Sequence, residues 1–122
     1  MASALEKVRE AYFIVDESEW DQVKSIKLVE LEFKLVVGFF DGSKLYVQYN
    51  QHNQYSYHLK FSNSQIDRIR YDNYDDRWPV KSKPHHFHPR NSKLAEKSPM
   101  IGNPKNDIPL LIEMIAKNKF NP

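Results

Sequence analysis

The possible folds of this chain are limited most strongly by an alternation of apolar and polar residues between residues 28 and 61. In "KLVELEFKLVVGFF" the apolar residues at positions 29, 31, 33, 35, 37 and 39 share one parity, and Glu30, Glu32 and Lys34 take the other. A period of two is typical of a strand with one buried face. Similar runs at residues 44–51, 55–61 and 66–71, separated by turn signals such as Asp41-Gly42, predict an antiparallel meander of about four to five strands.

Helical patterns flank this predicted sheet. Ser3 and Glu6 have the spacing of a capping box at the start of an N-terminal helix, and residues 12–15 are expected to leave that helix for a strand. The apolar residues of "DIPLLIEMIAKN" have the spacing of a C-terminal helix, and prolines predict an irregular segment from residue 72 to residue 106. The 122 residues therefore suit one α+β domain over residues 1–122, a curled antiparallel sheet with a helix at each end.

Composition excludes several classes of protein. The chain has no cysteine, so it has no disulfide framework, thiol nucleophile or cysteine-ligated zinc. Its first residues become charged before any apolar stretch develops, and its longest apolar run, at residues 35–40, is far shorter than a membrane span. We therefore expect a cytoplasmic protein without a membrane partner. Long apolar strands are also compatible with a homodimer.

The segment "KPHHFHPR", residues 83–90, concentrates three histidines within four positions. The flanking prolines favour an extended backbone, in which His86 and His88 point to one side and His85 and Phe87 to the other. Phe87 is then expected to anchor the segment in the core while His86 and His88 face solvent together. Two imidazoles at this spacing can share a metal ion or a phosphate.

The charges around the histidines favour an anionic ligand. Between residues 81 and 93 the cations are Lys81, Lys83, Arg90 and Lys93, and no acidic residue interrupts them. Such a field attracts phosphate and disfavours a divalent cation unless carboxylates join the site. The preceding stretch "YDNYDDRW" supplies three carboxylates that could orient a histidine or ligate a metal, namely Asp72, Asp75 and Asp76.

Further candidates lie on the predicted strands. His58 has the parity opposite to Tyr57 and Leu59, so it leaves the core, and Arg68 and Arg70 share a face that could bind a phosphate. Most of the tyrosines at positions 46, 49, 55 and 57 share the core parity, so we interpret them as structural rather than as base-stacking residues. A cationic, imidazole-rich site with nearby carboxylates has the groups needed to cleave RNA without a metal.

Two short motifs and the meander resemble the TumE-type toxins of toxin–antitoxin modules. "YSYHLKF" and a short turn lead into "IDRIRYDN", which supplies Arg70, Tyr71, Asp72 and Asn73 as the first motif. The second motif is the proline-led histidine cluster "PHHFH" at residues 84–88. The resemblance spans residues 28–90. It implies a small cytoplasmic toxin that acts on RNA and is neutralised by a helix-turn-helix antitoxin.

Three hypotheses remain open from the sequence. In the first, the chain is a ribonuclease without metal or cofactor, in which His86 and His88 form the acid–base pair and Asp72 orients them. His85 is a further catalytic candidate, and the residues expected to bind substrate are Arg70, Arg90, His58 and Lys83. In the second, the basic histidine-rich loop belongs to a non-enzymatic module that binds RNA or a protein. In the third, His85, His86 or His88 ligates a metal together with Asp72.

Overall fold

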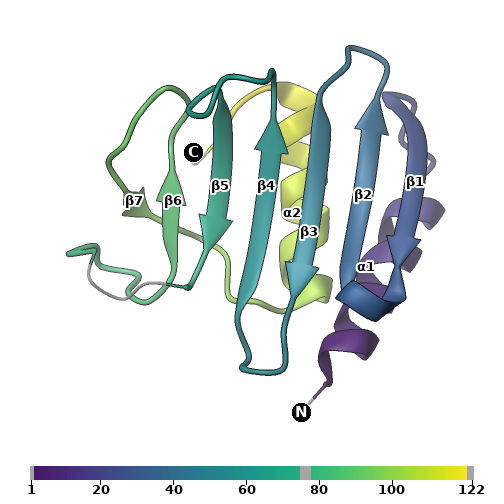
Figure 1. Cartoon of the computed structure of the whole chain (residues 1–122), viewed down its shortest axis with the longest axis horizontal. Coiled ribbons are helices and arrows are strands. Elements are labelled where there is room, and N and C mark those ends of the chain that lie inside the picture. Colours follow the sequence, from purple (N-terminus) through teal and green to yellow (C-terminus); the bar gives the residue numbers. More distant parts are fainter. Residues whose placement is uncertain (1, 75–77, 121–122) are drawn as a thin grey trace.

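Over the part of the chain that the structure describes, the protein has an α+β fold with seven strands and two helices (Figure 1). The computed structural model describes residues 2–74 and 78–120. The helices are α1 (Ala4–Glu17) and α2 (Pro104–Lys117), and a 3-10 turn, η1 (Glu30–Glu32), follows the first strand. The strands are β1 (Val23–Val29), β2 (Lys34–Phe39), β3 (Lys44–Tyr49), β4 (Tyr55–Lys60), β5 (Arg68–Asp72), β6 (His86–His88) and β7 (Glu96–Lys97). The expected antiparallel sheet and terminal helices are confirmed, but the expected four to five strands are too few.

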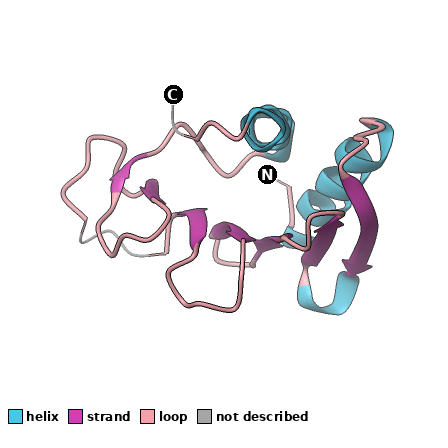
Figure 2. Ribbon diagram, turned by 90° about the horizontal axis from the view of Figure 1, so that it is seen from above, coloured by secondary structure: helices cyan, strands magenta, loops and turns pink. Residues whose placement is uncertain are grey.

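The strands follow one another across the sheet in chain order, and every neighbouring pair is antiparallel. Figure 2 shows that the sheet is arched and that both helices lie on one side of it. The strand residues of one parity point toward the helices and form the core: Leu35, Val37, Phe39, Leu45, Val47, Tyr49, Tyr55, Tyr57, Leu59, Ile69, Tyr71 and Phe87. The tyrosines at 49, 55 and 57 are thus structural, as predicted, whereas Tyr46 lies half-buried on the opposite face.

Helix α1 begins at the capping signal that the sequence contains, whereas α2 begins at Pro104 after the N-cap Asn103, inside the segment expected to be irregular up to residue 106. In α1 the Ser3 hydroxyl accepts from the Glu6 N–H, and the Glu6 side chain accepts from the Ser3 N–H, which confirms the capping box. The expectation that residues 12–15 leave the helix for a strand is wrong, because the buried residues of α1 recur at helical spacing through this stretch: Ala4, Val8, Ala11 and Val15.

Among the described residues no helix is long and apolar enough to span a bilayer.

The alternating run at residues 28–40 is not one strand, because it contains the end of β1, the turn η1 and then β2. The turn η1 interrupts it, and Phe33 then adopts a left-handed backbone conformation (φ 53°, ψ 40°). This reversal pairs Leu28 with Leu35 in antiparallel register and leaves Leu31 97% exposed. The predicted burial of Leu31 is wrong because residues in a turn do not keep the alternating directions of a strand.

The segment expected to be irregular contributes the last two strands. Residues of β6 pair with β5 as Arg70 with His88, Tyr71 with Phe87 and Asp72 with His86. Phe87 is buried and stacks on Tyr71 with ring centroids 4.4 Å apart, so it anchors the segment as predicted. These strands are three and two residues long, too short to show a period in the sequence.

Candidate active site

The histidine–carboxylate site lies at the end of β5, where this strand pairs with β6. The register places Asp72 opposite His86 and Arg70 opposite His88. Their side chains lie on the face of the sheet away from the helices, because the intervening Tyr71 and Phe87 point into the core. We call Arg70, Asp72, His86 and His88 the Arg70 cluster.

Both ring nitrogens of His86 face oxygen atoms. Its Nε2 lies 2.6 Å from Oδ1 of Asp72, and its Nδ1 lies 3.0 Å from the carbonyl oxygen of Pro84. An ionised carboxylate and a carbonyl are both acceptors, so a doubly protonated ring satisfies both contacts by donating. The two contacts fix the orientation of the buried His86 ring beside His88.

Arg70 connects the carboxylate to the second histidine. Its Nε lies 2.5 Å from Oδ2 of Asp72, and its Nη2 lies 3.4 Å from Nε2 of His88. Because a guanidinium can only donate, Nε2 of His88 accepts in this contact and the ring proton is on Nδ1. Burial and the nearby charge of Arg70 lower the pKa of His88 to about 4. His88 is therefore a neutral imidazole at physiological pH.

The histidines are much more buried than the sequence predicts. His86 is 1% exposed, His88 is 5% exposed and Asp72 is fully buried, so the expectation that both imidazoles face solvent is wrong. The reason is that β7 pairs with the outer edge of β6, and Trp78 packs against both rings with centroids 6.1 and 5.5 Å away. Solvent reaches the cluster at Arg70, whose side chain is 37% exposed.

Trp78 is a site residue that the sequence analysis missed. The only signal for it is a large aromatic residue in the polar stretch before the histidines. Such a residue is usually assigned to the core, and its position over the two imidazoles depends on how the connection from β5 to β6 folds.

A second neutral imidazole lies on the other side of Arg70. The register of β4 and β5 places His58 opposite Arg70, so His58, Arg70 and His88 form a row across three strands. Burial and the charge of Arg70 lower the pKa of His58 to about 4. Its buried Nε2 has no hydrogen-bond partner among the described residues. The prediction that the His58 side chain points away from the core is confirmed.

Asp72, His86 and His88 also have the spacing of metal ligands. One donor atom from each lies within 4.8 Å of the others, and two imidazoles with one carboxylate are a common donor set. The guanidinium of Arg70, however, already contacts Asp72 and His88. A divalent cation placed there is repelled by this charge at short range, so the arrangement favours an anion.

Two of the candidate residues from the segment 83–90, His85 and Lys83, lie outside the Arg70 cluster. His85 immediately precedes β6 and contacts the core residue Tyr55, on the side that its parity predicts, with its Nδ1 2.9 Å from the Tyr55 hydroxyl. Burial lowers the pKa of His85. Lys83 is exposed. The candidate carboxylates Asp75 and Asp76 lie outside the residues that the structure describes.

Arg90, expected to contact phosphate, makes different contacts. Its Nε lies 2.5 Å from Oδ1 of Asp67, and its guanidinium lies 3.9 Å from the centroid of the Phe61 ring. Asp67 precedes β5, whereas Asp72 ends it, so Arg90 and the Arg70 cluster occupy opposite ends of that strand. The structure does not bring Arg90 to the predicted site.

Comparison with known proteins places the chain in a family. The model of the family described as toxin TumE matches residues 2–118. This match extends beyond the resemblance at residues 28–90 in both directions and includes both helices. No curated protein and no solved structure gives a significant match. Because the matched region covers nearly the whole chain, the protein belongs to the TumE toxin family.

Proposed function

We propose that this toxin is an endoribonuclease that cleaves RNA at the Arg70 cluster without a metal ion. One observation carries the proposal: the partly exposed guanidinium of Arg70 lies between a buried carboxylate, Asp72, and a neutral imidazole, His88. A guanidinium binds phosphate through a planar pair of donors. A phosphate held there is next to groups that can accept and donate protons.

His88 is the general base in this proposal. Its neutral ring has an acceptor at Nε2, which contacts Arg70 in the absence of substrate. A phosphate that binds Arg70 draws the guanidinium away from this nitrogen and offsets its positive charge. Both effects raise the pKa of His88 toward the range in which an imidazole accepts a proton efficiently.

His86 is the general acid. Its two ring nitrogens lie beside the oxygen atoms of Asp72 and Pro84, and the contact with Asp72 orients the ring. The rings of His86 and His88 are 4.9 Å apart and nearly perpendicular, so the acid and the base lie side by side. Because Trp78 packs over both rings, the scissile nucleotide reaches them from the exposed side at Arg70.

The chemical step needs only RNA and these side chains. His88 removes the proton of the ribose 2′-hydroxyl, and the 2′-oxygen bonds to phosphorus while the bond from phosphorus to the 5′-oxygen breaks. His86 gives its proton to the leaving 5′-oxygen, and Arg70 stabilises the charge on the phosphoryl oxygens. The products are a 2′,3′-cyclic phosphate and a 5′-hydroxyl.

Cleavage of an RNA oligonucleotide in the presence of EDTA tests the proposal. His88→Gln and His86→Gln are each expected to reduce the cleavage rate by about 10²- to 10⁴-fold, the usual contribution of an acid or base. His52→Gln is the matched control, since His52 is an exposed histidine in the β3–β4 turn and is expected to leave the rate unchanged. Circular dichroism verifies that each variant is folded.

Two results would contradict the proposal in different ways. Cleavage that EDTA abolishes and zinc or manganese restores would support a metal site at Asp72, His86 and His88. RNA binding without cleavage, together with unchanged growth arrest in the two histidine variants, would identify a non-enzymatic binding module.

We also propose that the toxin acts in the cytoplasm, where its RNA substrate is found, and is neutralised by a helix-turn-helix antitoxin. The support is its membership of a toxin family. Co-expression with the protein encoded beside it should restore growth and give a complex in size-exclusion chromatography. Continued growth arrest during co-expression would contradict this assignment.

A further inference from the structure

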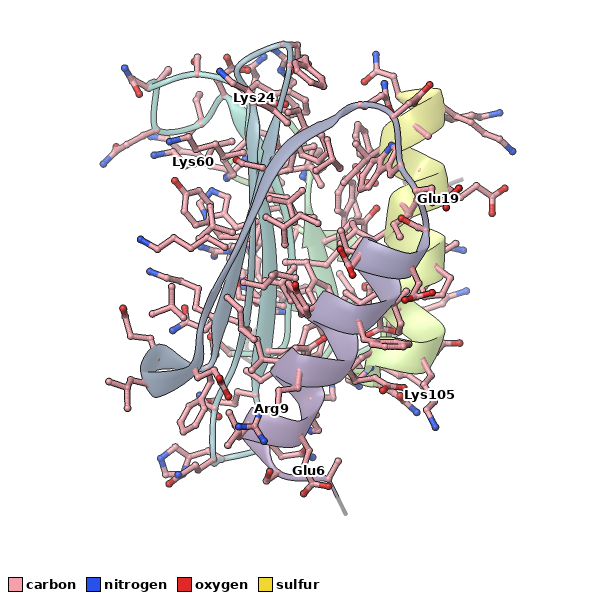
Figure 3. All side chains as sticks on the ribbon, turned by 90° about the vertical axis from the view of Figure 1, so that its right-hand side faces the viewer. Glu6, Arg9, Glu19, Lys24, Lys60 and Lys105 are labelled. Carbon is pink, nitrogen blue, oxygen red and sulfur yellow. The ribbon has the colours of Figure 1, made fainter. Side chains whose placement is uncertain are left out.

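The face of the sheet away from the helices is rich in cations. Strand register places on this face the lysines and arginines at positions 27, 34, 44, 60, 68 and 70. Figure 3 shows nitrogen-tipped side chains, with Lys60 among them, projecting from this face, whereas Lys105 lies on the helix side. We call this surface the open face.

Two cations of the open face lie beside an acid, Lys34 beside Glu32 and Arg70 beside Asp72, whereas the row in β3 to β5 is less compensated. Lys44, Lys60 and Arg68 are directly opposite one another in β3, β4 and β5, and Lys44 and Lys60 make no ion pair within the described residues. In β2 to β5 the only acidic residue of this parity is Asp72, which is buried against Arg70. Like charges in adjacent positions destabilise a sheet, so a row of this kind favours an anionic ligand.

An aromatic ring lies among these cations. Tyr46 is half-buried on the open face, opposite His58, with ring centroids 6.3 Å apart. The row that begins at Tyr46 continues through His58 and Arg70 to His88. It spans three strand spacings, about 14 Å at about 4.8 Å each. Tyr46 thus lies a short distance from the proposed site of cleavage.

We propose that the open face is the substrate track of the toxin, on which single-stranded RNA lies across β5, β4 and β3 with a base stacked on Tyr46. This inference rests on the proposed function, because it seats the scissile phosphate at Arg70. Lys44 and Lys60 contact backbone phosphates on one side of the row. Arg68 donates to the carbonyl oxygens of Pro89 and Ser92, so it contributes charge rather than a direct contact.

The combination of aromatic and basic residues favours a single strand over a duplex. A half-buried tyrosine two residues from Lys44 offers a stacking platform, and stacking requires an unpaired base. Double-stranded RNA presents phosphates and 2′-hydroxyls along its grooves and leaves such a platform unused. Two lysines and an arginine in one row, without partner acids, fit a polyphosphate backbone.

Binding is measured with a fluorescent 2′-O-methyl RNA oligonucleotide, which cannot be cleaved because its 2′-oxygen carries no proton. Tyr46→Ala is expected to weaken binding of the single strand by at least about fivefold, the lower limit for loss of one stacked base, and Tyr46→Phe to retain binding. The double variant K44A/K60A is expected to reduce the slope of log affinity against log salt by about 0.7 for each lost phosphate contact. Lys105→Ala, on the helix side, is the matched control and should bind like the wild type.

The result separates this inference from the proposed function. If Tyr46→Ala and K44A/K60A bind the single strand like the wild type while wild-type toxin still cleaves RNA, the substrate track is wrong and the ribonuclease proposal stands. If both variants lose binding but His88→Gln cleaves normally, the track is supported and the catalytic assignment fails. Equal affinity for the duplex, or loss of antitoxin binding alone in these variants, would assign the open face to another ligand.

Discussion

At the scale of single residues, burial and the guanidinium of Arg70 together lower the pKa of the two imidazoles on either side of Arg70, His58 and His88. His58 and His88 both have a pKa of about 4, with burial as the larger cause and Arg70 as the next. Asp72 compensates Arg70 on the third side. A neutral His88 and a compensated cation are compatible with the burial of Asp72, His86 and His88.

The lowered pKa of His88 makes stability depend on pH. The charged groups around it are Arg68, Arg70 and Asp72 of β5 and His86 of its own strand. Because the folded protein disfavours protonated His88, its contribution to stability is full above pH 6.5 and is lost as pH falls from about 6.5 to about 4. Lowering the pH from 7.5 to 5 is expected to reduce the free energy of unfolding of both the wild type and His88→Gln. The reduction in His88→Gln is expected to be smaller by about 2 kcal/mol, because this variant has no imidazole at position 88.

Urea denaturation at the two pH values measures this difference. His52→Gln is the control, because His52 is exposed and is expected to leave the pH dependence of the wild type unchanged. Parallel losses of stability in the wild type and His88→Gln would show that His88 is not held neutral by the fold.

At the scale of elements, alternation predicted the strands that are long enough to show it. Strands β3, β4 and β5 lie where the sequence placed them, and so do the parities of His58 and Arg70. The turn at η1 was missed, because its residues continue the alternation by type while Phe33 reverses the backbone. Strands β6 and β7 were missed because a few residues cannot establish a period.

The candidate site was predictable in part, because residues of equal parity in a strand point to the same face of the sheet. The parity of His86 and His88, and the motif that contains Asp72, were enough to place these residues together. The burial of the imidazoles was not predictable, because it depends on β7 and Trp78, which contact β6 from segments without regular patterns. The alignment of His58 with Arg70 depends on strand register, which turn geometry fixes.

The turn between β1 and β2 leads us to expect different effects of substitution at Leu31 and Leu35, which have equal parity in the sequence. Leu31→Ser is expected to change the free energy of unfolding by less than about 0.5 kcal/mol, because Leu31 projects into solvent. Leu35→Ala, four residues later and in the core, is expected to lower it by about 2–5 kcal/mol. Chemical denaturation of both variants gives the comparison. Similar large losses at both positions would indicate a continuous strand through residue 31.

At the scale of the whole molecule, one core joins the sheet to both helices. Buried residues of α1 and α2 pack with those of β2 to β6 in a single cluster, without a second core among the described residues. We therefore propose that residues 1–122 unfold as one cooperative domain.

The two tryptophans report on opposite ends of the sheet. Trp20 packs edge-on against Phe39 of β2, with ring centroids 4.9 Å apart, and Trp78 contacts the histidines of β6. Each of the variants Trp78→Phe and Trp20→Phe retains one tryptophan. In each variant, the fluorescence of that tryptophan and the far-ultraviolet circular dichroism are expected to change at the same denaturant concentration. Separate transitions for Trp78 and for the circular dichroism would show that the β6 end of the sheet unfolds independently.

The enclosed position of Asp72, His86 and His88 has a genetic consequence. Among colonies that survive induction of the toxin, most substitutions at these interior positions are less conservative than histidine to glutamine. They disrupt polar contacts of the fold and lower the amount of protein in the cell. Arg70 is the member of the cluster that reaches the surface. Survivors that still accumulate the full-length protein should therefore be concentrated at Arg70, and immunoblotting of such survivors would map the working parts of the toxin without purifying it.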